Sequence, residues 1–283
     1  MPAPAIAFFD LDKTLISRNS ATLWIRFELA AGRVTRWQAL QALGYVVRYS
    51  LGAADMSEAI RRSVASLAGR PEAELRDRAR VFYDQLVRPL YRPGAQTAIA
   101  AHRAAGDHLV LLTSSSIYMS EMVCRDLNLD GYLCNRLEVD AGGCYTGRPF
   151  EPLCFGAGKV QLATRYAAER GFRLSDAAFY TDSTSDLPML EAVGRPVAVN
   201  PDPRLRRLAK RRGWQVVDWS ARTGSPGLPT RAQNSRSQPR CATRRESPRR
   251  GADRSLRTGW FRVGSARCCR CRARPRPNRP RAR

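Results

Sequence analysis

The stretch that decides the fold is Phe8–Leu15, with the sequence FFDLDKTL. Its first two residues end an apolar run, Ala5–Phe9, that stops at Asp10. A short apolar run of this kind is typical of a buried strand in a parallel sheet. Side chains alternate along an extended backbone, so Asp10 and Asp12 are expected on one side of the chain, with Leu11 pointing away. We therefore predict a central strand that ends in two carboxylates.

After Pro93-Gly94, short apolar runs alternate with segments of helical spacing. The predicted strands are Leu109–Leu112, Ala177–Tyr180, Val197–Val199 and Trp214–Val217. The predicted helices are Ala95–Ala105, Ile117–Leu127, Lys159–Arg170, Leu187–Ala192 and Arg204–Arg212. Tyr132–Val139 and Cys144–Gly147 flank the turn Asp140–Gly143 and predict a hairpin. Strands separated by single helices indicate an α/β fold with a doubly wound parallel sheet.

Residues 17–90 interrupt this alternation and contain no convincing strand. Their apolar residues have helical spacing in four segments, which glycines and Pro71 separate. These predicted helices are Ala21–Ala31, Trp37–Leu51, Ser57–Leu67 and Glu72–Val87. We interpret 17–90 as a helical cap that is inserted into an α/β core formed by 1–16 and 91–220.

Residues 221–283 have a different composition. They hold 19 of the 48 basic residues of the chain and only 2 of its 25 acids, and seven prolines are scattered through them. Such a segment cannot bury enough apolar surface to offset the entropy lost on ordering, so we predict a disordered tail. An arginine-rich tail can bind nucleic acid by neutralising phosphates. The abrupt change is also typical of a shifted reading frame. Cys268–Cys271 has no distant second ligand pair, which argues against zinc.

The remaining sequence signals favour a cytoplasmic location. No basic segment precedes Ala5–Phe9, so this run does not resemble a signal peptide. No stretch approaches the roughly 18–20 apolar residues of a membrane span. The cysteines of the first 220 residues are too scattered for a metal site, and free thiols are the default in a reducing compartment. The sequence leaves the oligomeric state open.

Polar clusters follow three of the predicted strands: Asp10–Thr14, Thr113–Ser115 and Asp182–Asp186. Lys159 begins a helix between the second and third clusters. In open α/β sheets, ligands bind outside the carboxyl ends of the strands, so these groups are expected to share one crevice. Clustered carboxylates call for a cation, and hard oxygen ligands favour Mg²⁺. One carboxylate can attack phosphorus while another transfers the proton of the leaving group.

The segments FFDLDKTL, LVLLTSS, Lys159 and YTDSTSDLPML resemble, in order, the four motifs of the haloacid dehalogenase superfamily. The helical insert resembles the cap of its subclass IB, which contains phosphoserine phosphatase, and the resemblance covers residues 5–219. It implies a Mg²⁺-dependent phosphomonoester hydrolase that acts on a small phosphorylated metabolite through an aspartyl-phosphate.

The resemblance also implies roles for individual residues. Asp10 matches the nucleophile, Asp12 the general acid/base and Lys159 the motif lysine, which contacts the phosphate. The other phosphate-binding residues would be Thr14, Thr113 and Ser114. The metal would be held by Asp10, Asp12 through its backbone carbonyl, Asp182 and Asp186. Asp186 is also placed to cap the helix that follows it.

Some features leave alternatives open. Phosphoserine phosphatases carry a substrate-binding glutamate about nine residues after the nucleophile, where this chain has Asn19. This difference weighs against phosphoserine as the substrate. A phosphotransferase with the same intermediate is the first alternative, and a nucleic-acid-binding protein that acts through the tail is the second. His102 and His108 lie away from the motifs and are not expected to be ligands.

Overall fold

The computed structural model describes residues 4–50 and 56–220. The predicted tail, 221–283, and the predicted end of the second cap helix at Leu51 lie outside the described residues. Within these residues, no helix has both the length and the apolar character that crossing a membrane requires.

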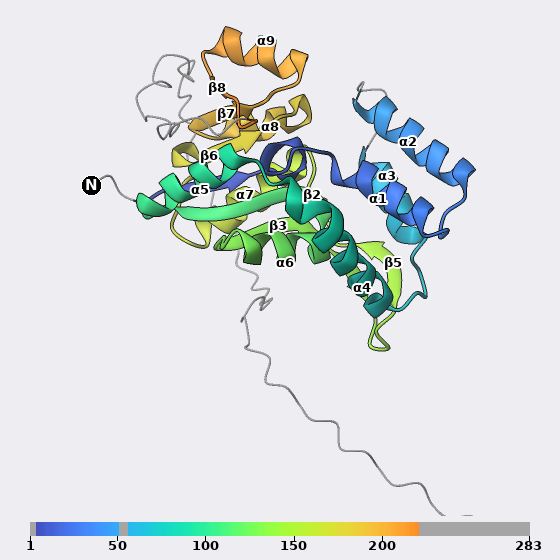
Figure 1. The fold of residues 1–283 in the computed structure, drawn as a ribbon. Helices are drawn as coiled ribbons and strands as arrows, with labels where there is room; N and C mark the ends of the chain where they lie inside the picture. Colours follow the sequence, from blue (N-terminus) through green and yellow to red (C-terminus); the bar gives the residue numbers. More distant parts are fainter. Residues whose placement is uncertain (1–3, 51–55, 221–283) are drawn as a thin grey trace, which may run out of the picture. The chain divides into compact units, whose positions relative to one another are not determined.

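A six-stranded parallel sheet forms the centre of the fold (Figure 1), with the order β3-β2-β1-β6-β7-β8. Its strands are β1 (Ile6–Phe9), β2 (His108–Ser116), β3 (Gly131–Asn135), β6 (Ala178–Thr181), β7 (Arg195–Val199) and β8 (Gln215–Val217). The chain builds outward from β1 to β3 on one side and then from β6 to β8 on the other. The order therefore reverses between β1 and β6, and such a switch point is where doubly wound sheets bind their ligands. The predicted fold class is confirmed.

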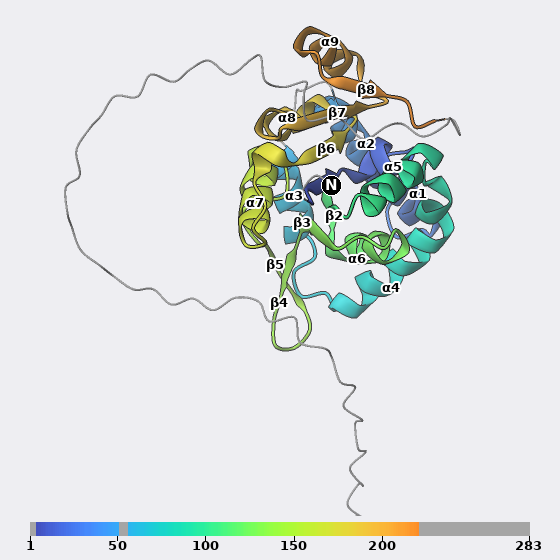
Figure 2. The ribbon, with the colours of Figure 1, turned by 90° about the vertical axis from the view of Figure 1, so that its left-hand side faces the viewer.

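Helices cover both faces of the sheet because alternate residues of each strand enter two separate apolar cores. Phe9 and Leu111 belong to one core and Phe8 and Leu112 to the other. The first core is covered by α5 (Pro93–Ala104) and α6 (Ile117–Asp126), the second by α7 (Ala157–Ala168), α8 (Leu187–Ala192) and α9 (Pro203–Arg212). Figure 2 shows α5 and α6 on the opposite side of the sheet from α7.

The hairpin predicted from Tyr132–Val139 and Cys144–Gly147 is only half right. The first part of that run is β3, which pairs in parallel with β2 in the main sheet. After the exposed Arg136 the chain turns away, and β4 (Leu137–Val139) pairs with β5 (Tyr145–Pro149) in a separate antiparallel ribbon. Leu137 and Val139 resume an apolar alternation directly after Asn135 and Arg136, so the sequence did not indicate that the chain leaves the sheet at these two polar residues.

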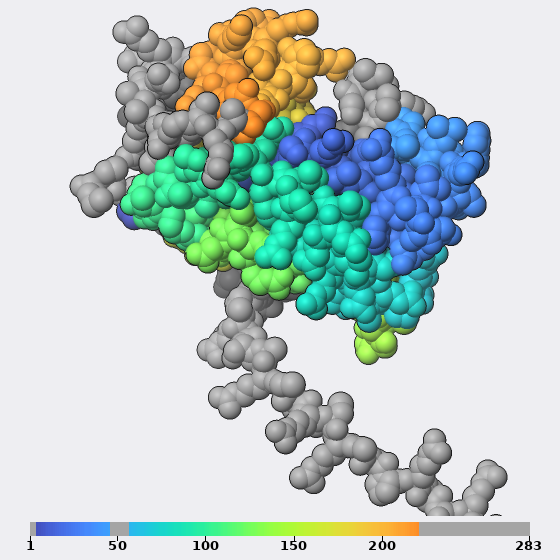
Figure 3. Space-filling model, in the orientation of Figure 1, coloured from blue at the N-terminus to red at the C-terminus, as the bar shows by residue number. Residues whose placement is uncertain are grey.

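The predicted helices of residues 17–90 are confirmed within one or two residues at their described ends, except that the last is shorter. They are α1 (Ser20–Ala30), α2 (Arg36–Ser50), α3 (Met56–Ala65) and α4 (Glu72–Phe82), the last followed by a wider turn over Tyr83–Val87. Glu28 joins α1 to α4, because its buried carboxylate lies 2.9 Å from the Arg78 guanidinium. Figure 3 shows the blue surface of α1 close to the teal surface of α4.

The helical insert is also attached to the rest of the chain through side-chain and backbone contacts. The Tyr83 hydroxyl at the end of α4 donates to Asp126 at 2.7 Å, and the side chain of Tyr83 lies in the core beside α6. The backbone of β5 bonds to the segment after α3, with Tyr145 N–H donating to Arg70 O at 2.9 Å. The division into a cap of 17–90 and a core remains a prediction.

A buried histidine lies on the face of the sheet that α5 covers. The Nδ1 of His102 is 2.7 Å from the Asp107 carboxylate, and its Nε2 is 2.8 Å from the Tyr180 hydroxyl. The side chain is fully buried, and the Tyr180 ring stacks on Phe9. A neutral ring with its proton on Nδ1 satisfies both contacts. These contacts give His102 a structural role in the core between α5 and the sheet.

Burial lowers the pKa of His102 below its ordinary value of 6.5, although Asp107 opposes the shift. As the pH falls, the unfolded chain binds this proton first, so the free energy of unfolding should decrease below about pH 6.5, by at most about 1.4 kcal/mol per pH unit. We expect urea denaturation between about pH 8 and pH 5.5 to show that the free energy of unfolding decreases more steeply with falling pH for the wild type than for His102→Gln. Other titrating groups are common to both proteins, so parallel curves would contradict the prediction.

Candidate active site

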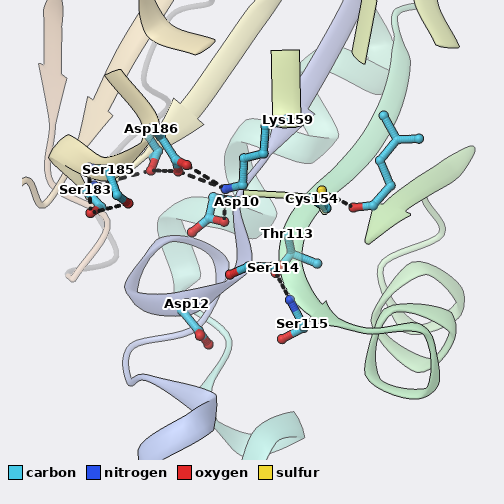
Figure 4. A network of polar contacts seen from close by, with 12 residues as sticks. Asp10, Asp12, Thr113, Ser114, Ser115, Cys154, Lys159, Ser183, Ser185 and Asp186 are labelled. Carbon is cyan, nitrogen blue, oxygen red and sulfur yellow. Dashed lines mark hydrogen bonds and ion pairs between the residues drawn. The ribbon is translucent and has the colours of Figure 1, made fainter. Parts of the chain in front are cut away.

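The three predicted polar clusters meet at the carboxyl edge of the sheet (Figure 4). Asp10 follows β1, Thr113 lies near the end of β2, and Asp182 follows β6. The backbone N–H of Asp10 donates to Tyr180 O at 2.9 Å, which joins the ends of β1 and β6. Since β1 and β6 flank the switch point, the two acids come together where the strand order predicts a site.

The centre of the site is a buried lysine between two carboxylates. The Nζ of Lys159 lies 2.9 Å from Asp10 Oδ1 and 2.9 Å from Asp186. The Thr181 hydroxyl donates a further hydrogen bond to Asp186, at 2.7 Å. Asp10 is 7% exposed and Lys159 is 2% exposed. Figure 4 shows Lys159 reaching from α7 into the space between the two acids.

The electrostatics of the site show more negative charge than one lysine balances. Burial raises the pKa of Asp10 to about 7, with Asp186 adding to the shift and Lys159 opposing it. Burial also raises the pKa of Asp182, to about 8, and the nearby charge of Asp10 adds to this shift. Burial alone would lower the pKa of Lys159, but Asp10 and Asp186 raise it, so this side chain stays charged. A bound cation would favour the ionised forms of both aspartates.

The oxygen donors at this edge fit a hard divalent cation. The described residues contain no group of three or more His, Cys, Asp or Glu side chains arranged to hold a metal. Asp10 and Asp182 nevertheless lie close enough that the charge of Asp10 raises the pKa of Asp182, and the Asp12 backbone carbonyl belongs to the loop that follows Asp10. Carboxylate and carbonyl oxygens are the donors that Mg²⁺ uses. Asp186 is already engaged by Lys159 and Thr181.

Lys159 is positioned by a close approach at the start of α7. A Cβ atom on Gly158 would overlap the backbone oxygen of Leu153, so only glycine allows the helix to begin here. Asn135, at the end of β3, accepts from Cys154 N–H at 2.8 Å and donates to Ser114 O at 2.7 Å. Asn135 thus joins the loop before α7 to the end of β2.

Asp12 lies apart from the ion-paired group, as Figure 4 shows. Its Oδ1 accepts from the Ser20 backbone N–H at 2.8 Å, and its Oδ2 is 3.4 Å from Asn19 Nδ2. Burial raises the pKa of Asp12, although the Ser20 hydrogen bond opposes the shift. A raised pKa favours the protonated form of this carboxyl group, which suits a proton donor.

The hydroxyl groups differ in what they contact. Thr113 Oγ1 accepts from Ser115 N–H at 3.2 Å, and Ser114 is exposed at the edge of the site. β2 extends to Ser116 rather than ending at Leu112 as predicted, so this cluster is part of the strand. Thr14 is fully buried, and its hydroxyl has no hydrogen-bond partner among the described residues. Its contact with a phosphate remains a prediction.

Two further findings concern the loop after β6. Asp186 ends the short turn Thr184–Asp186 and occupies the predicted N-cap position of α8, but its side chain makes no capping hydrogen bond, because Lys159 and Thr181 hold the carboxylate. Asp202 was not singled out as a site residue. It accepts from the Thr184 N–H and hydroxyl, both at 3.0 Å, and it caps α9. Asp202 therefore supports the loop that carries Asp182.

Comparison with known proteins identifies relatives. The family model described as haloacid dehalogenase-like hydrolase matches residues 7–191. A histidinol-phosphatase of Neisseria meningitidis is 31% identical over 218 residues, which are 76% of this chain and 98% of that protein. A phosphoserine phosphatase of Mycobacterium tuberculosis is 32% identical over 231 residues, which are 78% of this chain and 75% of that protein.

A solved structure of a Bordetella pertussis protein of unknown function is similar as well. It is 32% identical and superposes with a TM-score of 0.69, covering 76% of this chain and 99% of that chain. The family match spans β1 to α8 and includes Asp10, Asp12, Thr113, Lys159 and both acids of the loop after β6.

Proposed function

This chain belongs to the haloacid dehalogenase-like hydrolases, and from that premise we propose that it is a phosphatase that uses Asp10 as its nucleophile. Its substrate would be a small phosphorylated metabolite. The observation that carries the proposal is the position of Lys159 Nζ, 2.9 Å from both Asp10 and Asp186 at the carboxyl edge of the sheet. A buried cation beside a carboxylate favours its ionised form, and only the ionised form attacks phosphorus.

The reaction that we propose has two steps. In the first, an Asp10 oxygen attacks phosphorus and the bond to the leaving oxygen breaks, while Asp12 donates its proton to that oxygen. In the second, Asp12 takes a proton from water, whose oxygen attacks the aspartyl-phosphate and releases inorganic phosphate and free Asp10. Lys159, Thr113, Ser114 and Thr14 would bind the phosphoryl oxygens.

A Mg²⁺ ion is the cofactor that this donor set favours. Asp10, Asp182 and the Asp12 backbone carbonyl would hold it, with Asp186 contributing from beside Lys159. When bound, the ion supplies positive charge that neutralises the carboxylates and the phosphoryl oxygens. We expect the enzyme to act in the cytoplasm, a view that the absence of a disulfide among the four described cysteines supports.

The function is tested by phosphate release from a panel of small monophosphates by the full chain, with Mg²⁺ and with a chelator in its place. We expect release that the chelator abolishes. Histidinol phosphate and phosphoserine belong in the panel because they are named in the relatives. Adding alcohols at increasing concentration then separates hydrolysis from phosphotransfer, since a phosphotransferase would form a new phosphate ester with the alcohol. No release from any ester by the folded protein would contradict the proposal.

The role of Asp12 gives a prediction about leaving groups. An Asp12→Asn variant cannot donate the proton, so hydrolysis of alkyl phosphates should decrease by about 10²–10⁴-fold. The value of kcat/KM for p-nitrophenyl phosphate should decrease much less, because its leaving group is stable without the proton. Steady-state kinetics with glycerol phosphate and p-nitrophenyl phosphate measure kcat/KM, which depends only on the steps up to release of the leaving group, so the later activation of water by Asp12 does not enter it. An equal decrease of kcat/KM for both esters would show that Asp12 does not act as the general acid.

A further inference from the structure

A pocket of about 470 Å³ lies next to the proposed site, between the loop after β1 and the first turns of α1. Its lining includes three cationic side chains, Lys13, Arg18 and Arg26, and no acidic one. Asn19 also lines it and places its Nδ2 atom 3.4 Å from Asp12 Oδ2. The pocket therefore adjoins the proposed proton donor, where the part of the substrate beyond the phosphate would lie.

The two arginines of this pocket are not neutralised by the protein. Arg18 and Arg26 are exposed, and neither forms an ion pair within residues 4–50 and 56–220. By contrast, Arg33 and Arg78 of the same insert both pair with Glu28. Isolated surface arginines are ordinarily solvated, but like charges that line one concavity reinforce each other and attract anions into it.

Lys13 adds a cation at a position where the backbone disfavours it. Its φ of 56° is in the left-handed region, which costs a residue with a side chain about 1 kcal/mol relative to glycine. Lys13 directly follows Asp12 in the loop after β1 and also lines the pocket, so its charge lies at the reaction site as well as at the pocket. Lys13 is thus a cation that the pocket and the reaction site share.

Asn19 makes the pocket unsuited to an ammonium group. Its Oδ1 already accepts from Thr22 N–H at 2.9 Å as the cap of α1, and its Nδ2 faces Asp12. A substrate amine would thus find cations around it and no free carboxylate in the lining. A carboxylate or phosphate would instead find two guanidinium groups, which bind such anions through paired hydrogen bonds.

We propose that the substrate carries a second anionic group besides the phosphate that is removed, and that Arg18, Arg26 and Lys13 bind this group. The inference rests on the proposed function, because it places the phosphoryl group at Asp10. It names a substrate class: phosphorylated carboxylic acids and bisphosphates.

The experiment compares small esters that differ at one group. Glycerol 3-phosphate is neutral beyond its phosphate, 3-phosphoglycerate carries a carboxylate, propane-1,3-diol bisphosphate a second phosphate and phosphoethanolamine an ammonium. Binding to the full-length Asp10→Asn protein is measured by calorimetry, and kcat/KM is measured with the wild-type chain. We expect both anionic compounds to bind at least about tenfold more tightly than glycerol 3-phosphate, since hydrogen bonds to charged groups are the stronger ones.

The arginines are tested by the double variant Arg18→Gln/Arg26→Gln, with Arg36→Gln as the matched control. Arg36 is an exposed arginine of α2 outside the pocket lining. The double variant should lose the preference for the anionic esters, and the control should keep it. Equal affinity of the wild type for all four compounds, or tightest binding of phosphoethanolamine, would overturn the inference.

The two readouts separate this inference from the proposed function. Turnover of the esters without any anion preference would overturn the second-anion site alone. Selective binding of the anionic compounds without turnover of any ester would overturn the phosphatase and leave the anion site standing. A preference of the carboxylate over the bisphosphate, or the reverse, identifies which second anion the pocket takes.

Discussion

Replacement of Asp10 by Asn is expected to reduce kcat for every phosphomonoester by at least about 10⁴-fold. The amide has nearly the shape of the carboxylate, and its oxygen can still accept from Lys159 Nζ, which lies 2.9 Å from Asp10 Oδ1. It cannot form the acyl-phosphate, because a neutral amide oxygen is a poor nucleophile. The measurement is steady-state phosphate release by the full chain with Mg²⁺, at substrate concentrations well above KM.

The stability of the same variant shows whether activity is lost because the nucleophile is missing or because the protein does not fold. Burial and the nearby acids raise the pKa of Asp10 to about 7, so above that pH the ionised carboxylate destabilises the folded state relative to an unfolded chain. Asn removes this charge, and we expect the Tm of the variant near pH 8 to be no lower than that of the wild type. Asp77→Asn, at an exposed acid of α4, is the matched control and should keep full activity. An Asp10→Asn protein with activity within tenfold of the wild type would exclude Asp10 as the nucleophile.

The sequence predicted those parts of the site that depend on single strands. Asp10 and Asp182 stand where apolar runs stop, and a parallel sheet brings such ends to one edge. The sequence did not predict that β2 continues to Ser116, because hydroxyl residues neither favour nor forbid a strand. It also missed the bend after Asn135, because Leu137 and Val139 resume an apolar alternation just after the chain has left the sheet.

Contacts between distant segments could not be predicted from local patterns. Lys159 was expected near the acids, but the fold alone decides that it contacts both Asp10 and Asp186. Asn135 and Asp202 are single polar residues near strand ends, which are ordinarily turn or capping residues, so nothing in the sequence separated them from others of that kind. Each joins two loops of the site only because β3 and β7 bring it there.

Replacement of Lys159 by Met is expected to affect activity and stability together. The methionine keeps much of the apolar volume but leaves Asp10 and Asp186 without the cation that lies 2.9 Å from each. Removing one partner of a buried ion pair costs about 3–5 kcal/mol of unfolding free energy. Activity should decrease by about 10²-fold or more, because the phosphoryl oxygens and the nucleophile both lose a positive charge. Urea denaturation and phosphate release measure the two effects.

A second substitution separates these effects. Asp186→Asn in the Lys159→Met background removes one of the two uncompensated charges, while Thr181 can still donate to the remaining oxygen, as it does to Asp186 at 2.7 Å. The double variant should regain part of the lost stability, since a buried charge without a partner is the costly element. It should regain no activity, because no cation has been restored beside Asp10. Recovery of turnover along with stability would show that Lys159 serves the fold and takes no part in phosphoryl transfer, whereas recovery of stability alone assigns it both roles.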